Sequence, residues 1–336
     1  MALLYIDGFE YTSIDEFLKR WWANSNNLPT LLPNGGRDNS GAVMVTNFVI
    51  RKEVNLPVGV DIIVGVAFRS TISDQVTPIF IRTNGGDYFN VNLGPEYIGL
   101  FSGYSTVDTV LYTPVFLNEW NYVELKLQIS PSIAANSCVV RLNGVEVINL
   151  PEGSDTSNLG STRITDVEIW SNSNVYDDFY ICDSTGLINN DFLGDCKVKL
   201  IRPAADGTYT DGTPSTGTSH YSVVNGASYT PGTGVQLSAS GDKESFYMTQ
   251  LTTSSIFNGT IHGIQLSSTI VKYDGKGIPL AAGLVMDGTT EAELDTNIIP
   301  YVTSSTSTLQ ILSTDLNSAP WTAESINSAQ FGIVIK

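Results

Sequence analysis

The chain has 336 residues, is 42% hydrophobic and only 15% charged, and carries a formal net charge of −17 at pH 7. This balance argues against nucleic acid as a partner and against an anionic membrane surface, because both need clustered lysine and arginine. No apolar run approaches the roughly 20 residues of a membrane span, and the N-terminal segment lacks the basic region of a signal peptide. We therefore expect a soluble protein that is made in a cytoplasm.

Length and composition together favour two all-β domains. A chain of this size is typical of two domains that each bury a core. Serine, threonine, asparagine and glycine replace the missing charged residues, which is typical of β proteins with many turns. The three cysteines, Cys138, Cys182 and Cys196, have neither a metal-like spacing nor a disulfide framework. We expect Cys138 and Cys182 to be buried thiols within strands.

The first segment predicts an edge strand at Leu3–Ile6 and then a short helix. Ser13 and Glu16 form a capping-box pattern, and apolar residues recur at helical spacing as far as Trp21. One face of this helix would pack on a sheet. No other segment of the chain predicts a helix as clearly.

The next segments, up to residue 182, are alternating or wholly apolar, as the strands of a sandwich are. Asn143-Gly144 between two alternating runs predicts a β-hairpin, and so does the turn at 84–87. The strands expected in this half are Ala42–Thr46, Phe48–Val54, Ile62–Arg69, Thr77–Thr83, Tyr88–Leu93, Tyr97–Phe101, Val110–Tyr112, Glu119–Ile129, Cys138–Leu142, Val145–Leu150, Ile164–Trp170 and Val175–Cys182.

A turn-rich connector, 183–195, separates the two halves and leads into a further expected strand, Cys196–Ile201. Three of its residues are apolar, so we expect a fixed elbow. The expected domains are one β-sandwich over residues 1–187 and a second over 188–336. The strands expected after the elbow are Tyr221–Val224, Ser245–Leu251, Ile256–Ser267, Ala281–Met286, Leu309–Leu312 and Gln330–Ile335.

Several phrases in fixed order carry a family resemblance. EWNYVELKLQI, VVRLNGVEVINL, TDVEIW and YDDFYICDSTG follow one another, after an Asp7-Gly8-Phe9 opening. This order resembles the laminin-G/concanavalin A-like jelly roll of bacteriophage virion proteins. The segment from GDCKVKLIRP onward resembles the second β domain that follows this sandwich in phage structural proteins. The resemblance implies two β-sandwiches, the first a jelly roll.

Some jelly rolls of this kind are glycosidases, so paired carboxylates matter. Hydrolysis needs two acids on one face, and alternate strand positions supply them. Asp166 and Glu168 are spaced in this way, but the Glu-x-Asp-x-x-Glu string of the endoglucanase relatives is absent. We interpret the pair as the solvent face of an edge or outer strand, and we predict no enzymatic activity and no catalytic residue.

Two further groups are candidate contacts. Asp177 and Asp178 are the best candidates for a calcium site, since carboxylates at a sandwich rim suit a hard cation; the alternative is that they bind loop N–H groups. We otherwise expect no cofactor. Exposed aromatic rings stack on sugars or partner subunits. The candidates for such glycan or partner contacts are Tyr88, Tyr97, Tyr104 and Trp22.

The resemblance implies a non-enzymatic virion component of a tailed phage, either a capsid decoration or a tail or baseplate protein. Such a protein is made in the host cytoplasm, contacts other virion proteins and forms a homo-oligomer. The alternative is a carbohydrate-binding adhesin or receptor-binding module that contacts a host-surface glycan. A glycan hydrolase of the same fold is a third hypothesis.

Overall fold

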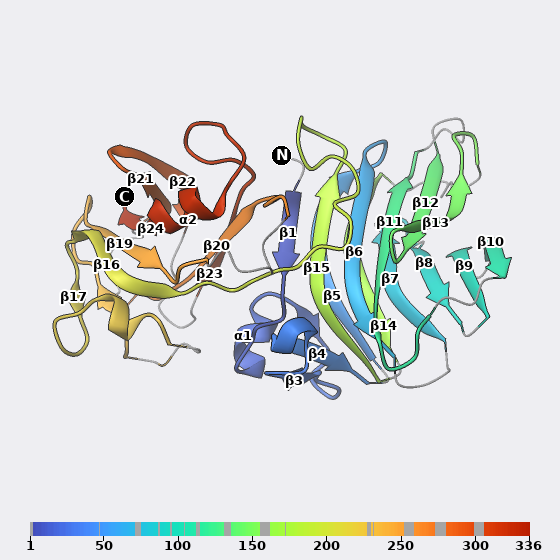
Figure 1. Cartoon of the computed structure of the whole chain (residues 1–336), viewed down its shortest axis with the longest axis horizontal. Coiled ribbons are helices and arrows are strands. Elements are labelled where there is room, and N and C mark those ends of the chain that lie inside the picture. The colour runs from blue at the N-terminus through green and yellow to red at the C-terminus, as the bar shows by residue number, and fades with distance from the viewer. Residues whose placement is uncertain are drawn as a thin grey trace. The chain divides into compact units, whose positions relative to one another are not determined.

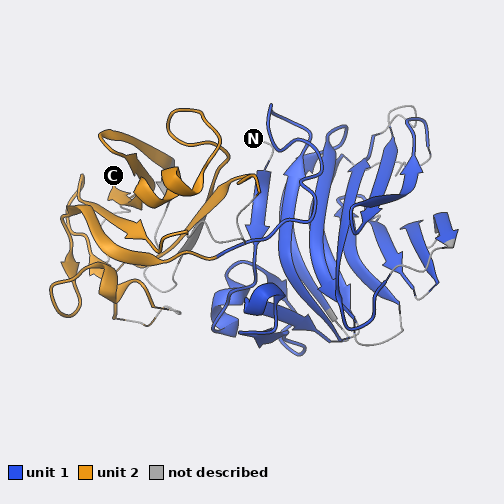
Figure 2. Ribbon diagram, viewed as in Figure 1, with its two compact units in different colours: residues 1–199 blue, residues 200–336 orange. Residues whose placement is uncertain are grey.

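The computed structural model describes residues 3–46, 48–70, 75–86, 88–94, 96–103, 105–111, 115–130, 136–154, 162–171, 173–226, 230, 232–251, 259–272, 280–298 and 306–336. The chain forms two compact units, Met1–Lys199 and Leu200–Lys336 (Figure 2). Both are built from antiparallel strands (Figure 1). The predicted all-β fold class is confirmed.

The first unit is a sandwich of two antiparallel sheets. One sheet has the order β13-β12-β11-β6-β15-β4-β3, with β1 also paired to β15. Its strands are β1 Leu3–Asp7, β3 Thr30–Leu32, β4 Ala42–Val45, β6 Asp61–Arg69, β11 Trp120–Gln128, β12 Ser137–Leu142, β13 Val145–Leu150 and β15 Asn174–Asp183.

The other sheet of this unit has seven strands in the order β10-β9-β8-β7-β14-β5-β2. These strands are β2 Trp22–Ala23, β5 Phe48–Pro57, β7 Val76–Thr83, β8 Tyr88–Leu93, β9 Tyr97–Ser102, β10 Ser105–Leu111 and β14 Arg163–Ser171. This arrangement is the concanavalin A-like jelly roll that was expected. Cys138 and Cys182 are buried free thiols in β12 and β15, also as expected.

Apolar side chains of both sheets fill the space between them. In β6 the run from Ile62 to Phe68 is buried, because a central strand is covered on both sides. In the seven-stranded sheet only alternate residues enter this core, for example Ile50, Ile81 and Ile169. The intervening side chains project from the opposite surface, which we call the outer face.

The N-terminal segment fixes the edge of the seven-stranded sheet. Helix α1, Ile14–Leu18, begins as predicted at Ser13, whose hydroxyl accepts a hydrogen bond from the Glu16 amide. Trp21 is buried beyond the helix and donates its indole N–H to Asp7 Oδ2 at 2.8 Å. The next residue starts β2 and points the other way, because neighbouring strand residues face opposite sides. Trp22 is therefore presented to solvent.

The second unit contains a five-stranded sheet in the order β16-β19-β24-β21-β22 and two strand pairs, β17-β18 and β20-β23. The sheet strands are β16 Pro203–Thr210, β19 Lys243–Met248, β21 Ala281–Asp287, β22 Thr290–Ile298 and β24 Gln330–Ile335. The paired strands are β17 Thr213–Pro214, β18 Val235–Gln236, β20 Ile264–Ile270 and β23 Thr306–Leu312.

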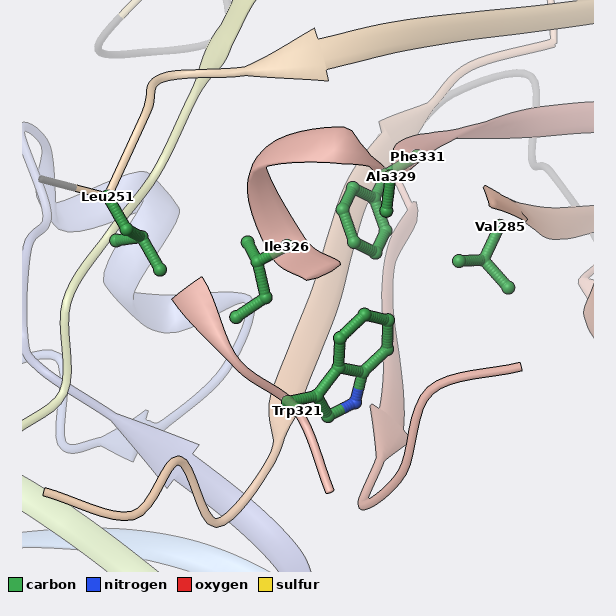
Figure 3. Close-up of a cluster of buried hydrophobic side chains, with 6 residues drawn as sticks. All are labelled: Leu251, Val285, Trp321, Ile326, Ala329 and Phe331. Atoms are coloured by element: carbon green, nitrogen blue, oxygen red, sulfur yellow. The ribbon is translucent and has the colours of Figure 1, made fainter. Parts of the chain in front are cut away.

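A hydrophobic cluster forms the core of this second unit (Figure 3). It includes Trp321, whose ring centroid lies 6.2 Å from that of Phe331. Ile326 enters the cluster from α2, Ala323–Ser328, a helix that the sequence did not predict. Thr322 and Ser325 cap this helix reciprocally. The helix was missed because it is short and because serine replaces the usual Glu or Gln of a capping box.

The compact units divide at 199/200, whereas the sequence placed the boundary at 187/188. The segment 193–198 belongs to the first unit, because its backbone binds side chains of the eight-stranded sheet. Gly194 N donates to Glu124 Oε1 at 2.9 Å, and Val198 N donates to Asp178 Oδ1 at 2.7 Å. The strand expected at Cys196–Ile201 is not formed; these residues have no regular secondary structure.

Candidate functional site

One row of side chains crosses six strands of the seven-stranded sheet. Residues that pair directly across antiparallel strands project on the same face. The row is Trp22, Arg51, Glu168, Phe80, Asn90 and Phe101, from β2, β5, β14, β7, β8 and β9 in that order. Neighbours of these residues in sequence, such as Ile50, are buried in the core. The row therefore lies on the outer face, and we call it the cross-strand row.

Three aromatic rings from three strands stack on one another beside this row. The Trp170 and Phe80 centroids are 5.2 Å apart, with an interplanar angle of 25°. The Phe80 and Tyr88 centroids are 4.7 Å apart, at 21°. Trp170 remains 40% exposed, although β14 is an interior strand of its sheet. We call these three rings the aromatic ladder. Phe80 is buried at 7% exposure and Tyr88 is half-buried, so Trp170 is the ring of this aromatic ladder that is most open to solvent.

A saturated ion pair holds the ladder in place. Arg82 donates from Nε to Glu168 Oε1 at 2.9 Å and from Nη2 to Oε2 at 3.0 Å. Trp170 Nε1 donates to the same Oε2 at 2.7 Å. The hydrogen bonds that Arg82 donates to Glu168 raise the pKa of Arg82. Both carboxylate oxygens of Glu168 are thus engaged by protein donors.

A second ion pair on the same face is not saturated. Arg51 Nε lies 3.5 Å from Asp166 Oδ1 and makes no hydrogen bond. The Arg51 guanidinium sits over the Trp22 ring, 4.4 Å from its centroid. Asp166 is 7% exposed. Within the described part of the chain, it receives no hydrogen bond.

The outer face brings together three of the four predicted aromatic contact residues. Trp22 lies in the row at 46% exposure, and Tyr88 is in the ladder. Tyr97 lies on β9, two residues before Gly99 and four before Phe101, and so on the same face. Tyr104 lies outside the described residues.

Asp166 and Glu168 also project from this face, as their spacing predicted. The expectation of an edge or outer strand is wrong, because β14 is paired on both sides, by β5 and β7. Their burial follows from this central position. Trp170 could have been recognised from the same alternation, being two residues beyond Glu168. Arg51, Phe80 and Arg82 had no local signal, since they arrive by pairing between distant strands.

Asp177 and Asp178 lie together on β15, away from the outer face. Asp177 Oδ2 accepts hydrogen bonds from Arg37 N and Ser40 Oγ, both at 2.8 Å. Asp178 Oδ2 forms an ion pair with Arg37 Nη1 at 3.0 Å. Burial raises the pKa of Asp178 to about 6. Burial and the neighbouring Asp178 charge raise the pKa of Asp177 to about 7. The cation beside them in this structure is Arg37, and both bind loop N–H groups.

The described residues contain neither a metal-binding cluster nor a membrane-spanning helix. Within those ranges, no group of three or more His, Cys, Asp or Glu side chains is arranged to hold a metal ion. Of the described helices, none has both the length and the apolar character needed to cross a membrane. Calcium binding at Asp177 and Asp178 stays a prediction.

No protein-family model matches the chain, and no curated protein matches it. Solved structures are similar at low identity. A protein of unknown function with a galectin-like fold from Bacillus subtilis has a TM-score of 0.38 and 13% identity, over 54% of this chain and 96% of that one. The carbohydrate-binding module CBM66 from Bacillus subtilis has a TM-score of 0.36 and 10% identity, over 48% of this chain and 94% of that one.

Domain 4 of AbnA, a GH43 extracellular arabinanase from Geobacillus stearothermophilus solved with arabinotriose, has a TM-score of 0.37 and 12% identity, over 54% of this chain and 92% of that domain.

Proposed function

We propose that the protein binds a carbohydrate on the outer face of its seven-stranded sheet. The observation that carries this proposal is the aromatic ladder, Trp170-Phe80-Tyr88, set beside charged hydrogen-bonding groups on the same face. Sugars combine apolar C–H surfaces with hydroxyl groups. A surface that interleaves stacked rings with donors and acceptors is complementary to both.

We further propose binding without hydrolysis. Glycosidases need one carboxyl that can give a proton and a second that acts as base or nucleophile. Both oxygens of Glu168 already accept hydrogen bonds from Arg82 or Trp170. These contacts occupy both oxygens of Glu168 and leave Asp166 without a second carboxyl that is free to act as the acid.

The test uses a glycan array followed by calorimetry with the full chain. We expect Trp170→Ala to weaken binding of the glycans so found about tenfold or more, which is ~1.4 kcal/mol. Trp120→Ala is the matched control, since Trp120 is a half-buried tryptophan of the other sheet. Equal losses in both variants, or no glycan bound by the wild type, would contradict the proposal. Release of reducing sugar would contradict the absence of hydrolysis.

The setting that we propose follows from the sequence resemblance: a phage particle that displays this module, in several copies, to host-surface glycans. Antibody labelling of purified virions tests it directly. Antibody label on the virions would support this setting. Virions of the source phage that carry no label would contradict it.

A further inference from the structure

We propose that Arg51 and Asp166 form a hydroxyl-binding pair that selects neutral sugars carrying two adjacent free hydroxyl groups. This inference rests on the proposed function, and it names the class of ligand and the residues that select it. The pair lies next to the aromatic ladder: Arg51 is opposite Glu168, and Asp166 is opposite Arg82, across adjacent strands.

The two ion pairs of the outer face differ in how completely they are satisfied. Glu168 receives three hydrogen bonds, two from Arg82 and one from Trp170. Asp166 is also buried, at 7% exposure, but nothing in the described ranges donates a hydrogen bond to it. A carboxylate is an acceptor with about four lone-pair sites, so Asp166 keeps sites for a ligand. Asp166 can therefore accept hydrogen bonds from the hydroxyl groups of a ligand.

Arg51 supplies the complementary donors. Its Nε is buried without a hydrogen-bond partner, and its side chain is 28% exposed. The guanidinium forms an ion pair with Asp166 and a cation–π contact with the Trp22 ring. A planar guanidinium has five N–H donors in a fixed fork, so several remain for a ligand. Trp22 acts as a positioning residue, because the cation–π contact at 4.4 Å fixes the fork beside Asp166.

An acceptor-only group next to a donor-only group suits hydroxyls, which donate and accept at the same oxygen. One hydroxyl donates a hydrogen bond to Asp166 and accepts one from Arg51. A neighbouring hydroxyl uses the remaining acceptor sites of Asp166 and donors of Arg51. An acidic sugar is disfavoured. Glu53 is directly opposite Asp166, so the outer face here holds three carboxylates, of Glu53, Asp166 and Glu168, against two arginines, Arg51 and Arg82.

The experiment measures the full chain against neutral polysaccharides (xylan, arabinan, mannan and laminarin) and acidic ones (polygalacturonate and alginate) by affinity electrophoresis and calorimetry. We expect wild-type binding among the neutral set only. Asp166→Asn should weaken that binding about tenfold or more and raise relative affinity for the acidic set, a change of selectivity that a merely structural role would not produce. Arg51→Lys, which keeps the charge but loses the fork, should also weaken binding about tenfold.

Glu146→Gln is the matched control, because it removes the same charge from an exposed residue of β13 in the other sheet, and its affinity should stay within about twofold of wild type. If Asp166→Asn does not fold, Arg51→Lys carries the test.

Wild-type affinity in both variants, with binding still lost in Trp170→Ala, would overturn the hydroxyl-binding pair alone. Binding of none of these polysaccharides by the wild type would overturn this inference, and an empty glycan array would remove the proposed function as well. Preferred binding of an acidic polysaccharide would overturn only the selectivity proposed here.

Discussion

At the scale of single residues, Glu168 links the fold to the proposed binding surface. It is 2% exposed and joins β14 to β7 through Arg82 while it orients the Trp170 indole. Removing one partner of a buried ion pair leaves the other charge buried and unpaired. The resulting loss in the free energy of unfolding is larger than the net stabilisation that the intact pair provides. Arg82 keeps one-third of its side chain in solvent, which moderates this penalty.

We predict that Glu168→Gln lowers the free energy of unfolding by about 1–3 kcal/mol, because Arg82 and Trp170 lose a charged acceptor. Urea unfolding followed by fluorescence measures this change. The control is Glu146→Gln, an exposed carboxylate that accepts a hydrogen bond from the exposed Asn149 and should change stability by less than about 0.5 kcal/mol. An unchanged unfolding midpoint for Glu168→Gln would show that the pair does not stabilise the sheet.

The buried pair Asp177 and Asp178 predicts an unusual pH dependence. Burial raises the pKa of Asp178 to about 6, and burial together with the neighbouring Asp178 charge raises that of Asp177 to about 7. Because the folded values lie above the unfolded ones, the pair's contribution to stability is full below pH ~4 and is lost as pH rises towards 7. Carboxyl ¹³C chemical shifts should show apparent pKa values in this raised range.

The same titration contains its own control. In Asp178→Asn the neighbouring charge is removed, so the pKa of Asp177 should fall towards its ordinary value while burial still holds it above that value. Ordinary pKa values for both residues in the wild type would contradict the expected raising.

At the scale of elements, close packing on the eight-stranded sheet explains why the segment after β15 belongs to the first unit. Tyr180 lies across Gly65 of β6, the residue opposite it in the sheet. Its hydroxyl donates to the buried Glu124 and accepts from Leu193 N at 3.2 Å. The glycine is needed for space, because a Cβ there would be 2.2 Å from Tyr180 Cε1.

We predict that Gly65→Ala destabilises the first unit by about 1–3 kcal/mol, since the Tyr180 ring must move and its contacts with Glu124 and Leu193 weaken. Chemical unfolding gives the value. In a Tyr180→Ala background the same glycine substitution should cost much less, because the obstructing ring is gone. Equal penalties in both backgrounds would show that the ring does not limit the space at Gly65.

At the scale of the whole molecule, each unit has its own buried core and its own sheets (Figure 2). A domain with a separate core is able to fold alone. The outer face lies entirely within the first unit, so the proposed binding requires no residue beyond 199.

We predict that a fragment of residues 1–199 unfolds cooperatively and retains the glycan affinity of the full chain. A fragment of 1–187 should have a lower melting temperature, because Glu124, Tyr180 and Asp178 lose the backbone partners Gly194, Leu193 and Val198. Thermal unfolding followed by circular dichroism compares the two. Identical melting temperatures would favour the earlier boundary at 187/188.

The sequence by itself determined what depends on neighbouring residues. Alternating and apolar runs predicted the all-β class, Ser13 and Glu16 predicted the start of α1, and the i, i+2 spacing placed Asp166 and Glu168 on one face. Trp22 and Tyr88 were predicted as contact residues, and the structure places both on the outer face.

Only the tertiary structure decided which of these residues meet. Trp22, Arg51, Phe80 and Glu168 are far apart in sequence and become neighbours through the register of four paired strands. That register depends on which apolar faces fit together in the shared core, and a shift of one residue would turn every side chain of the row inward. Local pattern fixes the alternation within a strand, whereas non-local packing fixes the partner strand, and the proposed binding face exists only once both are set.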